Sequence, residues 1–111
     1  MTGIELIAEE RQRQIEKEGF DAKHDQENDF KDMVKAALFY AEASMFALDF
    51  GDSPKVIEKM KEYLCFRNHF PFNWDKKWCK PSNDPIRNLE KAGALIAACI
   101  DKLKENNYES V

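Results

Sequence analysis

The sequence predicts an all-α protein, a helical bundle of about four helices in a single domain. Apolar residues recur at spacings of three and four through most of the chain, which is typical of amphipathic helices. Residues that cap helices precede these segments, namely Thr2, Asp29, Asp52 and Asp84. The length of 111 residues allows one hydrophobic core but not two.

The composition is typical of a soluble globular protein, with 43% hydrophobic and 34% charged residues. Seventeen basic residues against twenty-one acidic ones give a net charge of −4, which argues against general nucleic-acid binding but allows a local basic patch. No segment has the apolar length of a membrane span or the layout of a signal peptide, so we expect no membrane contact. The three widely spaced cysteines, Cys65, Cys79 and Cys99, fit free thiols in a reducing cytoplasm.

Residues 1–28 are expected to form the first helix and a polar loop. Thr2 and Glu5 have the spacing of a capping box, and the helix should run to about Lys17 and end at Gly19. One face of this helix carries apolar residues at helical spacing, namely Ile4, Ile7, Ala8 and Ile15.

Arg11 lies inside this apolar stripe, with Gln14 and Glu18 along it. A charge on a surface that faces the core is costly unless it is paired, so Arg11 requires a partner. Two interpretations stay open. One is an internal network of Arg11 with Glu18 or Gln14 that fixes helix packing, and the other is a polar cluster that faces a ligand.

The following loop contains the adjacent pair His24 and Asp25. A histidine beside a carboxylate is able to bind a metal or to act as an acid and base. No second pair at helical spacing accompanies it, so we predict no metal site. The alternative is a surface loop whose acidic residues cap a helix.

Residues 29–65 are expected to form the second and third helices. The second, from Phe30 to about Asp49 with Gly51 after it, is apolar on more than one face and is predicted to be the central helix. The apolar surface that remains predicts a homo-oligomer. The third helix follows Pro54 and is short and amphipathic, through Ile57, Met60 and Leu64.

Residues 66–84 are predicted to form an aromatic and cationic loop, which core packing explains least. Two tryptophans and three phenylalanines lie there among lysines. A long aromatic connection in a small domain either packs over the core or has a function. Cys65, His69 and Cys79 lack the fourth ligand of a zinc site, so no metal is predicted here either.

The last helix is predicted for residues 85–106, with Asp84 as its cap, before a tail at 107–111. Arg87 and Lys91 lie in its first turns, where the helix dipole favours acids. Cations placed there, beside free amides, are typical of an anion site; the alternative is pairing with Asp84, Glu90 or Glu18. One stripe is apolar and is expected to be buried: Leu89, Ala92, Gly93, Ile96, Cys99, Ile100 and Leu103.

Two blocks of sequence are specific when taken together: ERQRQIEKEGF followed by HD, and W-x-x-x-W-x-K-P-x-x-D-x-x-R-x-L-x-K-A-G-A-L-I. Over 10–101 the chain resembles a family of small phage and prophage proteins of poorly defined function. The resemblance implies a phage or prophage origin and action in the cytoplasm of a bacterial host. Cys99 stands where members often have a glutamate, which argues against a catalytic acid there. The first block is met by Glu10, Arg11, Arg13, Gln14, Glu18 and Gly19.

We therefore predict a phage-type, non-catalytic protein that binds a phosphate-bearing small ligand, a nucleotide, and so sequesters a host signalling nucleotide or counters a host defence. Arginine and lysine side chains would hold the phosphate, and tryptophan would stack on a base. No catalytic residue and no cofactor is predicted. The candidate ligand-binding residues are Arg11, Gln14, Glu18, His24, Trp74, Trp78, Lys80, Arg87 and Lys91.

The sequence also allows two alternative functions. One is a MazG-like nucleoside triphosphate pyrophosphohydrolase, which would hold magnesium between paired acids on facing helices. The first helix has glutamates for this, but no later helix has the E-x-x-D spacing on a core-facing surface. The other is an inhibitor of a host protein that uses the aromatic run from Phe66 to Trp74 as its contact surface.

Overall fold

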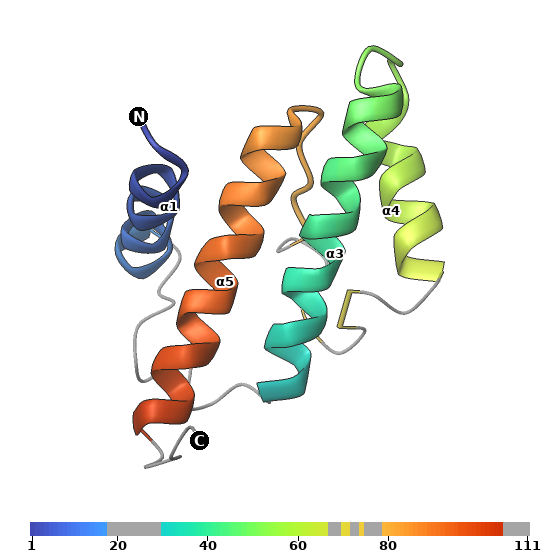
Figure 1. Ribbon diagram of the computed structural model, residues 1–111. Helices are drawn as coiled ribbons and strands as arrows, with labels where there is room; N and C mark the ends of the chain where they lie inside the picture. The colour runs from blue at the N-terminus through green and yellow to red at the C-terminus, as the bar shows by residue number, and fades with distance from the viewer. Residues whose placement is uncertain (18–29, 67–69, 72–73, 75–78, 106–111) are drawn as a thin grey trace.

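The computed structural model describes residues 1–17, 30–66, 70–71, 74 and 79–105, and every regular element in these ranges is an α-helix (Figure 1). The helices are α1 (Gly3–Lys17), α3 (Phe30–Phe50), α4 (Val56–Phe66) and α5 (Pro85–Glu105). Helices α3 and α5 lie antiparallel at the centre, with α1 packed against α5 and α4 against α3. The protein is an all-α four-helix bundle, which confirms the predicted fold class.

The helix ends follow local chemistry. The Thr2 hydroxyl accepts a hydrogen bond from the Glu5 amide at 3.2 Å, and the Glu5 carboxylate accepts one from the Thr2 amide at 3.1 Å, which confirms the capping box. Helix α4 begins at Val56, two residues after Pro54. Within the expected capping segment from Asp52 to Pro54, the Ser53 hydroxyl accepts a hydrogen bond from the Lys55 amide at 3.4 Å.

The core is built around α3. Its aromatic pair packs edge to face, with the rings of Phe39 and Tyr40 5.2 Å apart, and Phe39 also contacts Phe70 from the aromatic stretch. The side of α3 that meets its neighbours is rich in buried alanines, which let adjacent helices approach closely. These alanines are Ala36, Ala37, Ala43 and Ala47.

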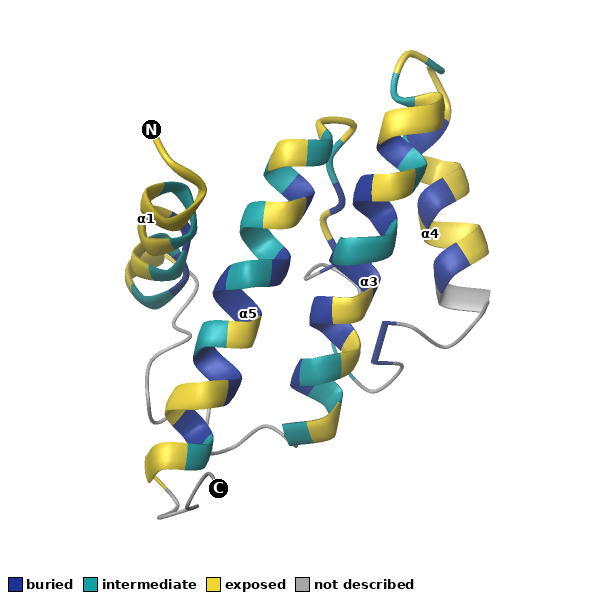
Figure 2. Cartoon of the chain, viewed as in Figure 1, coloured by how far each residue is buried: buried dark blue, intermediate teal, exposed yellow. Residues whose placement is uncertain are grey.

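The buried side of α5 differs from the expected stripe. Leu89, Ile96 and Ile100 are each 52% exposed, so the prediction that they are buried is wrong. The small alanine side of α5 turns inward instead, because it allows a closer approach to α3, and the larger side chains are left outside (Figure 2). The buried residues of α5 are Asn88, Ala92, Ala94, Leu95, Ala98, Cys99 and Lys102.

The buried side of α1 is polar, which the sequence pattern did not predict. Ile4 is 82% exposed and Ala8 is exposed, whereas the buried residues are Glu10 and Gln14. Ile7 meets α5 at Gly93, where an added Cβ would lie 2.5 Å from the Ile7 Cδ1 atom. Helix α1 is seen nearly end-on in Figure 1 while α5 runs down the page, so the two helices cross steeply. Ile7 lies against Gly93 at this crossing.

Ile7 and Gly93 provide a test of this crossing. Gly93→Val drives a branched side chain into Ile7, and we expect it to lower the free energy of unfolding by about 1–3 kcal/mol. The double variant Ile7→Ala/Gly93→Val should recover part of this loss, because the shorter residue leaves room. Urea denaturation measures both effects.

Gly3→Val is the matched control, because nothing lies within 4 Å of a Cβ added at Gly3. We expect its effect on the free energy of unfolding to stay within about 0.5 kcal/mol. Equal losses at Gly3 and Gly93 would contradict the close crossing.

Candidate functional site

The site is organised around the carboxylate of Glu10. Glu10 lies one turn after Ile7 on the side of α1 that faces α5, and its side chain is 2% exposed. It is the one acidic side chain that is buried among the described residues. A buried carboxylate requires positive or hydrogen-bonding partners, because its desolvation is otherwise too costly.

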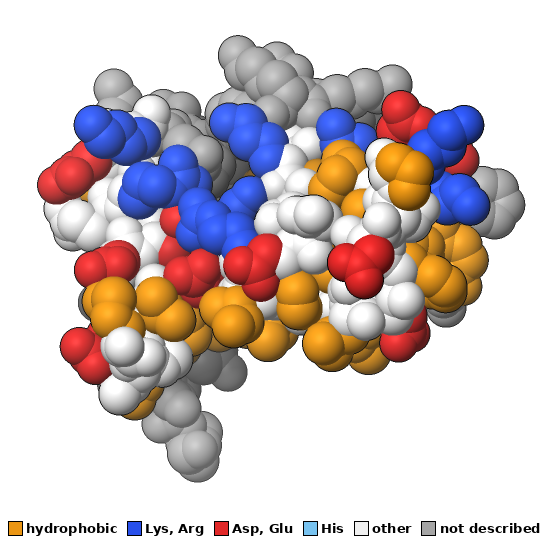
Figure 3. All heavy atoms as spheres, turned by 90° about the horizontal axis from the view of Figure 1, so that it is seen from above, with side chains coloured by type: hydrophobic (Ala, Val, Ile, Leu, Met, Phe, Trp, Pro, Cys, Tyr) orange, Lys and Arg blue, Asp and Glu red, His pale blue; other side chains and the backbone are white. Residues whose placement is uncertain are grey.

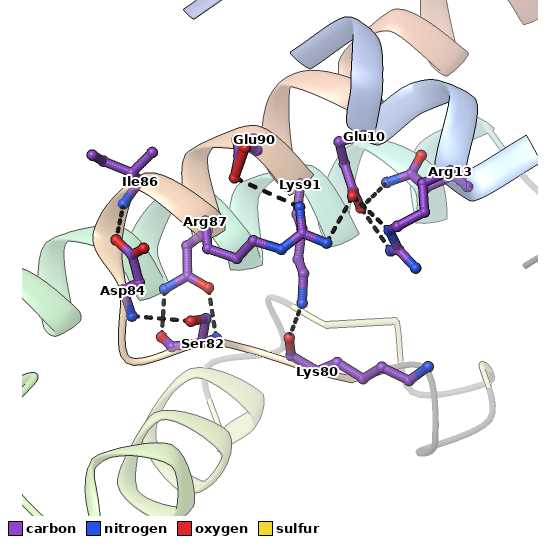
Figure 4. Close-up of polar contacts among 11 residues, drawn as sticks. Glu10, Arg13, Lys80, Ser82, Asp84, Ile86, Arg87, Glu90 and Lys91 are labelled. Atoms are coloured by element: carbon purple, nitrogen blue, oxygen red, sulfur yellow. Dashed lines mark hydrogen bonds and ion pairs between the residues drawn. The ribbon is translucent and has the colours of Figure 1, made fainter. Parts of the chain in front are cut away.

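Two arginines and a glutamine surround this carboxylate (Figure 4). Arg13 donates from Nε to Glu10 Oε1 at 2.7 Å and from Nη2 to Oε2 at 2.8 Å, a two-pronged contact within one helix turn. Arg87 of α5 approaches from the other helix, with its Nη2 atom 2.7 Å from Oε1. Gln14 Nε2 donates to Oε2 at 3.3 Å. The carboxylate therefore joins α1 to α5.

The pKa of Glu10 reflects two opposed effects. Burial raises it, but the hydrogen bonds and positive charges of Arg13 and Arg87 outweigh burial and hold the pKa below its ordinary value. Glu10 is therefore ionised near neutral pH. The Arg87 Nη1 atom also lies 3.6 Å from the Glu90 Oε2 atom. The Arg87 side chain is therefore held by two acids, Glu10 and Glu90.

The segment before α5 is fixed by a buried asparagine. Asn88 is fully buried, and its side chain accepts from the Ser82 amide at 2.7 Å and donates to the Ser82 carbonyl at 2.8 Å. Ser44 of α3 donates to the Pro85 carbonyl at 2.9 Å. These contacts hold the start of α5 and the segment before it in one position relative to α3.

Lys80 and Lys91 are positioned by the same segment. The Lys80 amide donates to the Tyr40 hydroxyl at 3.0 Å, and Lys91 Nζ donates to the Lys80 carbonyl. Lys91 Nζ also lies 5.5 Å from the centre of the Tyr40 ring, within the range of a cation–π interaction. The exposed Lys80 side chain extends away from these contacts (Figure 4).

The structure brings some of the predicted site residues together. Gln14, Lys80, Arg87 and Lys91 lie around the start of α5. Arg11 points elsewhere: its Nη2 atom lies 3.8 Å from Asp101, which is about four turns beyond Arg87 on α5.

Trp74 is half-buried and packs against the core, with its ring 5.9 Å from that of Phe70. Glu18, His24 and Trp78 lie outside the described residues, so their roles stay predictions. Cys79 is buried, whereas the other two residues of the zinc hypothesis, the Cys65 side chain and His69, are likewise outside them.

Asp84 caps the start of α5, as the sequence predicts. Its carboxylate accepts a hydrogen bond from the Ile86 amide at 2.9 Å, so one of the first amides of α5 is bound by an internal acid. An anion site at Arg87 and Lys91 stays a prediction. Arg87 pairs with Glu90, which is one of the acidic partners expected from the sequence. The acid closest to Arg87, however, is Glu10.

Four residues of the site were missing from the sequence-based list: Glu10, Arg13, Tyr40 and Asn88. Glu10, Arg13 and Gln14 have spacings of three and four, which put them on one side of a helix and were a usable signal. Asn88 and Tyr40 act on segments distant in sequence, which no local pattern indicates.

In the part of the chain that the structure describes, no group of three or more histidine, cysteine or acidic side chains is placed to hold a metal ion. Within the same ranges, none of the helices combines the length and the apolar character that crossing a membrane requires.

Replacement of Glu10 tests its role. Glu10→Gln keeps the size of the side chain but removes the charge, and we expect it to lower the free energy of unfolding near neutral pH by about 1–3 kcal/mol. The expected loss is smaller than the loss from breaking a fully buried ion pair, because both arginines are partly exposed to solvent. Glu9→Gln, at an exposed neighbour, should change the stability by less than about 0.5 kcal/mol.

The same pair of variants predicts a pH dependence. The pKa of Glu10 is lower in the folded than in the unfolded state, so its ionised form stabilises the fold above the ordinary pKa of about 4.3. This stabilisation disappears as the pH falls through the lowered pKa. Urea denaturation should therefore show wild type and Glu10→Gln converging as the pH falls from about 5 to about 3. A constant difference would contradict the lowered pKa.

Comparisons with protein-family models, with curated proteins and with solved structures find no significant match for this chain. The resemblance to small phage and prophage proteins therefore stays a prediction from the sequence.

Proposed function

We propose that the protein binds a phosphate-bearing small ligand, of the nucleotide class, without converting it. The site would be the cationic cluster formed by Arg13, Lys80, Arg87 and Lys91. The observation that carries this proposal is the support of two arginines by one buried carboxylate, Glu10.

This support orients the guanidinium groups before any ligand arrives. The side chains of Arg13 and Arg87 stay 38% and 32% exposed although Glu10 beneath them is buried. An arginine that is already held in place loses less side-chain entropy when it binds a phosphate, and its planar group matches phosphate geometry. Figure 3 shows lysine and arginine side chains across the upper part of the view from above, with acidic side chains among them.

The segment beside these arginines adds further positive charge. Lys91 lies about one turn after Arg87 on α5, and its Nζ atom donates to the Lys80 carbonyl. The segment that carries Lys80 is fixed by Asn88 and Tyr40, so the added charge is held on a defined backbone. The nucleotide class is proposed from the sequence, in which Trp74 and Trp78 precede Lys80 within six positions. Tyr40 is buried and its ring lies beneath Lys91, so it supports that cation.

The contacts of Glu10 support the proposal that the protein binds its ligand without catalysis. Magnesium-dependent hydrolysis of nucleotides needs carboxylates that face the metal and the substrate phosphates. Glu10 is occupied by both arginines and Gln14, and a metal ion would have to displace them. The role proposed for such binding is sequestration of a host signalling nucleotide. The sequence resemblance implies that the protein is of phage type and acts in a bacterial cytoplasm.

Titration with nucleotides tests the proposal. Calorimetry with adenine and guanine nucleotides, cyclic dinucleotides and ADP-ribose should identify a ligand, and Lys80→Ala should raise its Kd about tenfold through loss of one charge-assisted contact. The variant keeps the Lys80 amide and carbonyl, which make the structural hydrogen bonds. The ligand should be recovered unchanged by chromatography after incubation with magnesium.

Lys104→Ala is the matched control, because Lys104 is an exposed lysine near the other end of α5. We expect its Kd to stay within about twofold of wild type, since a distant surface charge is screened by salt. Binding that is equally weakened by both variants would place the ligand elsewhere, and the absence of any heat with the whole panel would remove the nucleotide class.

A further inference from the structure

A broad apolar face remains exposed on the central helices. On α5, Leu89, Ile96 and Ile100 are each 52% exposed, and on α3, Leu38 and Met45 are 52% and 61% exposed. Figure 3 shows hydrophobic side chains along the lower edge of the view and lysine and arginine side chains across its upper part. A patch of this kind on a small protein marks a contact surface.

A groove runs between the two rows of side chains. It has a volume of about 330 Å³, and Ala37 and Ala41 of α3 line it together with Cys99 of α5. Larger residues form its borders, including Leu38 and Ile96. Small residues in the groove and large ones beside it let a second helix surface with the same pattern fit into it.

The charges next to this face are arranged in order along α3. Lys31, Lys35, Glu42 and Asp49 follow one another at spacings of four, seven and seven residues, which places them along one line of the helix. The two cations lie in the first half of α3 and the two acids in the second half. The corresponding stripe of α5, through Leu89, Ile96, Ile100 and Leu103, carries no charged residue.

We propose that a second copy of this chain covers this face, with α3 of one copy antiparallel to α3 of the other around a two-fold axis close to Leu38. In this arrangement Lys35 of each copy lies opposite Glu42 of the other, because the midpoint of these two positions falls between Leu38 and Phe39. A two-fold axis repeats each contact twice, so one line of charges with opposite ends complements itself.

The dimensions suit such a dimer. Helices α3 and α5 have 21 residues each, so each is about 31 Å long. With helix axes about 9 Å apart they present a face of roughly 600 Å² before side-chain relief is counted, which is of the order of the ~800 Å² that each partner buries in a stable interface. The interface leaves out the cationic cluster, so dimerisation and ligand binding are separable.

Sedimentation velocity over a range of concentrations tests the proposal on the full chain. Wild type should be a dimer, and Leu38→Glu should raise the dissociation constant at least tenfold, because it puts a charge at the centre of the interface. Ile4→Glu is the control, since Ile4 is an exposed apolar residue on α1, away from the face. Helix content by circular dichroism shows that each variant is folded.

Charge reversal tests the antiparallel arrangement. Lys35→Glu and Glu42→Lys should each weaken the dimer several-fold, and the double variant should restore wild-type association, because each residue faces the other across the axis. A wild type that is monomeric at every concentration overturns the proposal. So does a double variant without recovery, or an Ile4→Glu variant as defective as Leu38→Glu.

Discussion

The arrangement of α1 depends on one carboxylate. Glu10 is buried between α1 and α5, where it binds Arg13 of its own helix and Arg87 of the other. A buried charge costs free energy unless its partners are well placed, so this contact specifies the position of α1 more narrowly than apolar packing alone would. Apolar packing at the same crossing includes Ile7 of α1 against Gly93 of α5.

The central pair, α3 and α5, is held by a different kind of interaction. Small alanines bring the two helices together, and buried polar groups then fix their ends, with Ser44 bound to the Pro85 carbonyl and Asn88 bound to the backbone of Ser82. Polar groups in a core are stable when each is satisfied, and they exclude other registers. The result is a rigid support for Lys80, Arg87 and Lys91.

The two exposed surfaces of this support have opposite character. At one end, Arg13 and Arg87 contact Glu10 and Lys91 contacts the Lys80 carbonyl, and the proposed ligand site lies there. The outer face of α3 and α5 is apolar, which suits a protein surface of matching shape. Both surfaces result from the way α5 packs against its neighbours. Its alanine side faces α3, so Leu89, Ile96 and Ile100 remain exposed. Arg87 then lies at the edge of α5 that meets α1.

The sequence by itself determined the four helices and several of their ends. Caps such as Thr2 with Glu5, and Asp84 before Pro85, act within one turn, so local chemistry is sufficient to predict them. Tertiary structure decided which sides of α1 and α5 are buried and which arginine meets which acid. Glu10 and Arg87 are 77 positions apart in the chain (87 minus 10), and Arg11 is adjacent to Glu10, so only the steep crossing of α1 and α5 decides that Arg87 meets Glu10 while Arg11 meets Asp101. Helical periodicity shows which residues share one side of a helix, but the neighbouring helix determines which side is buried.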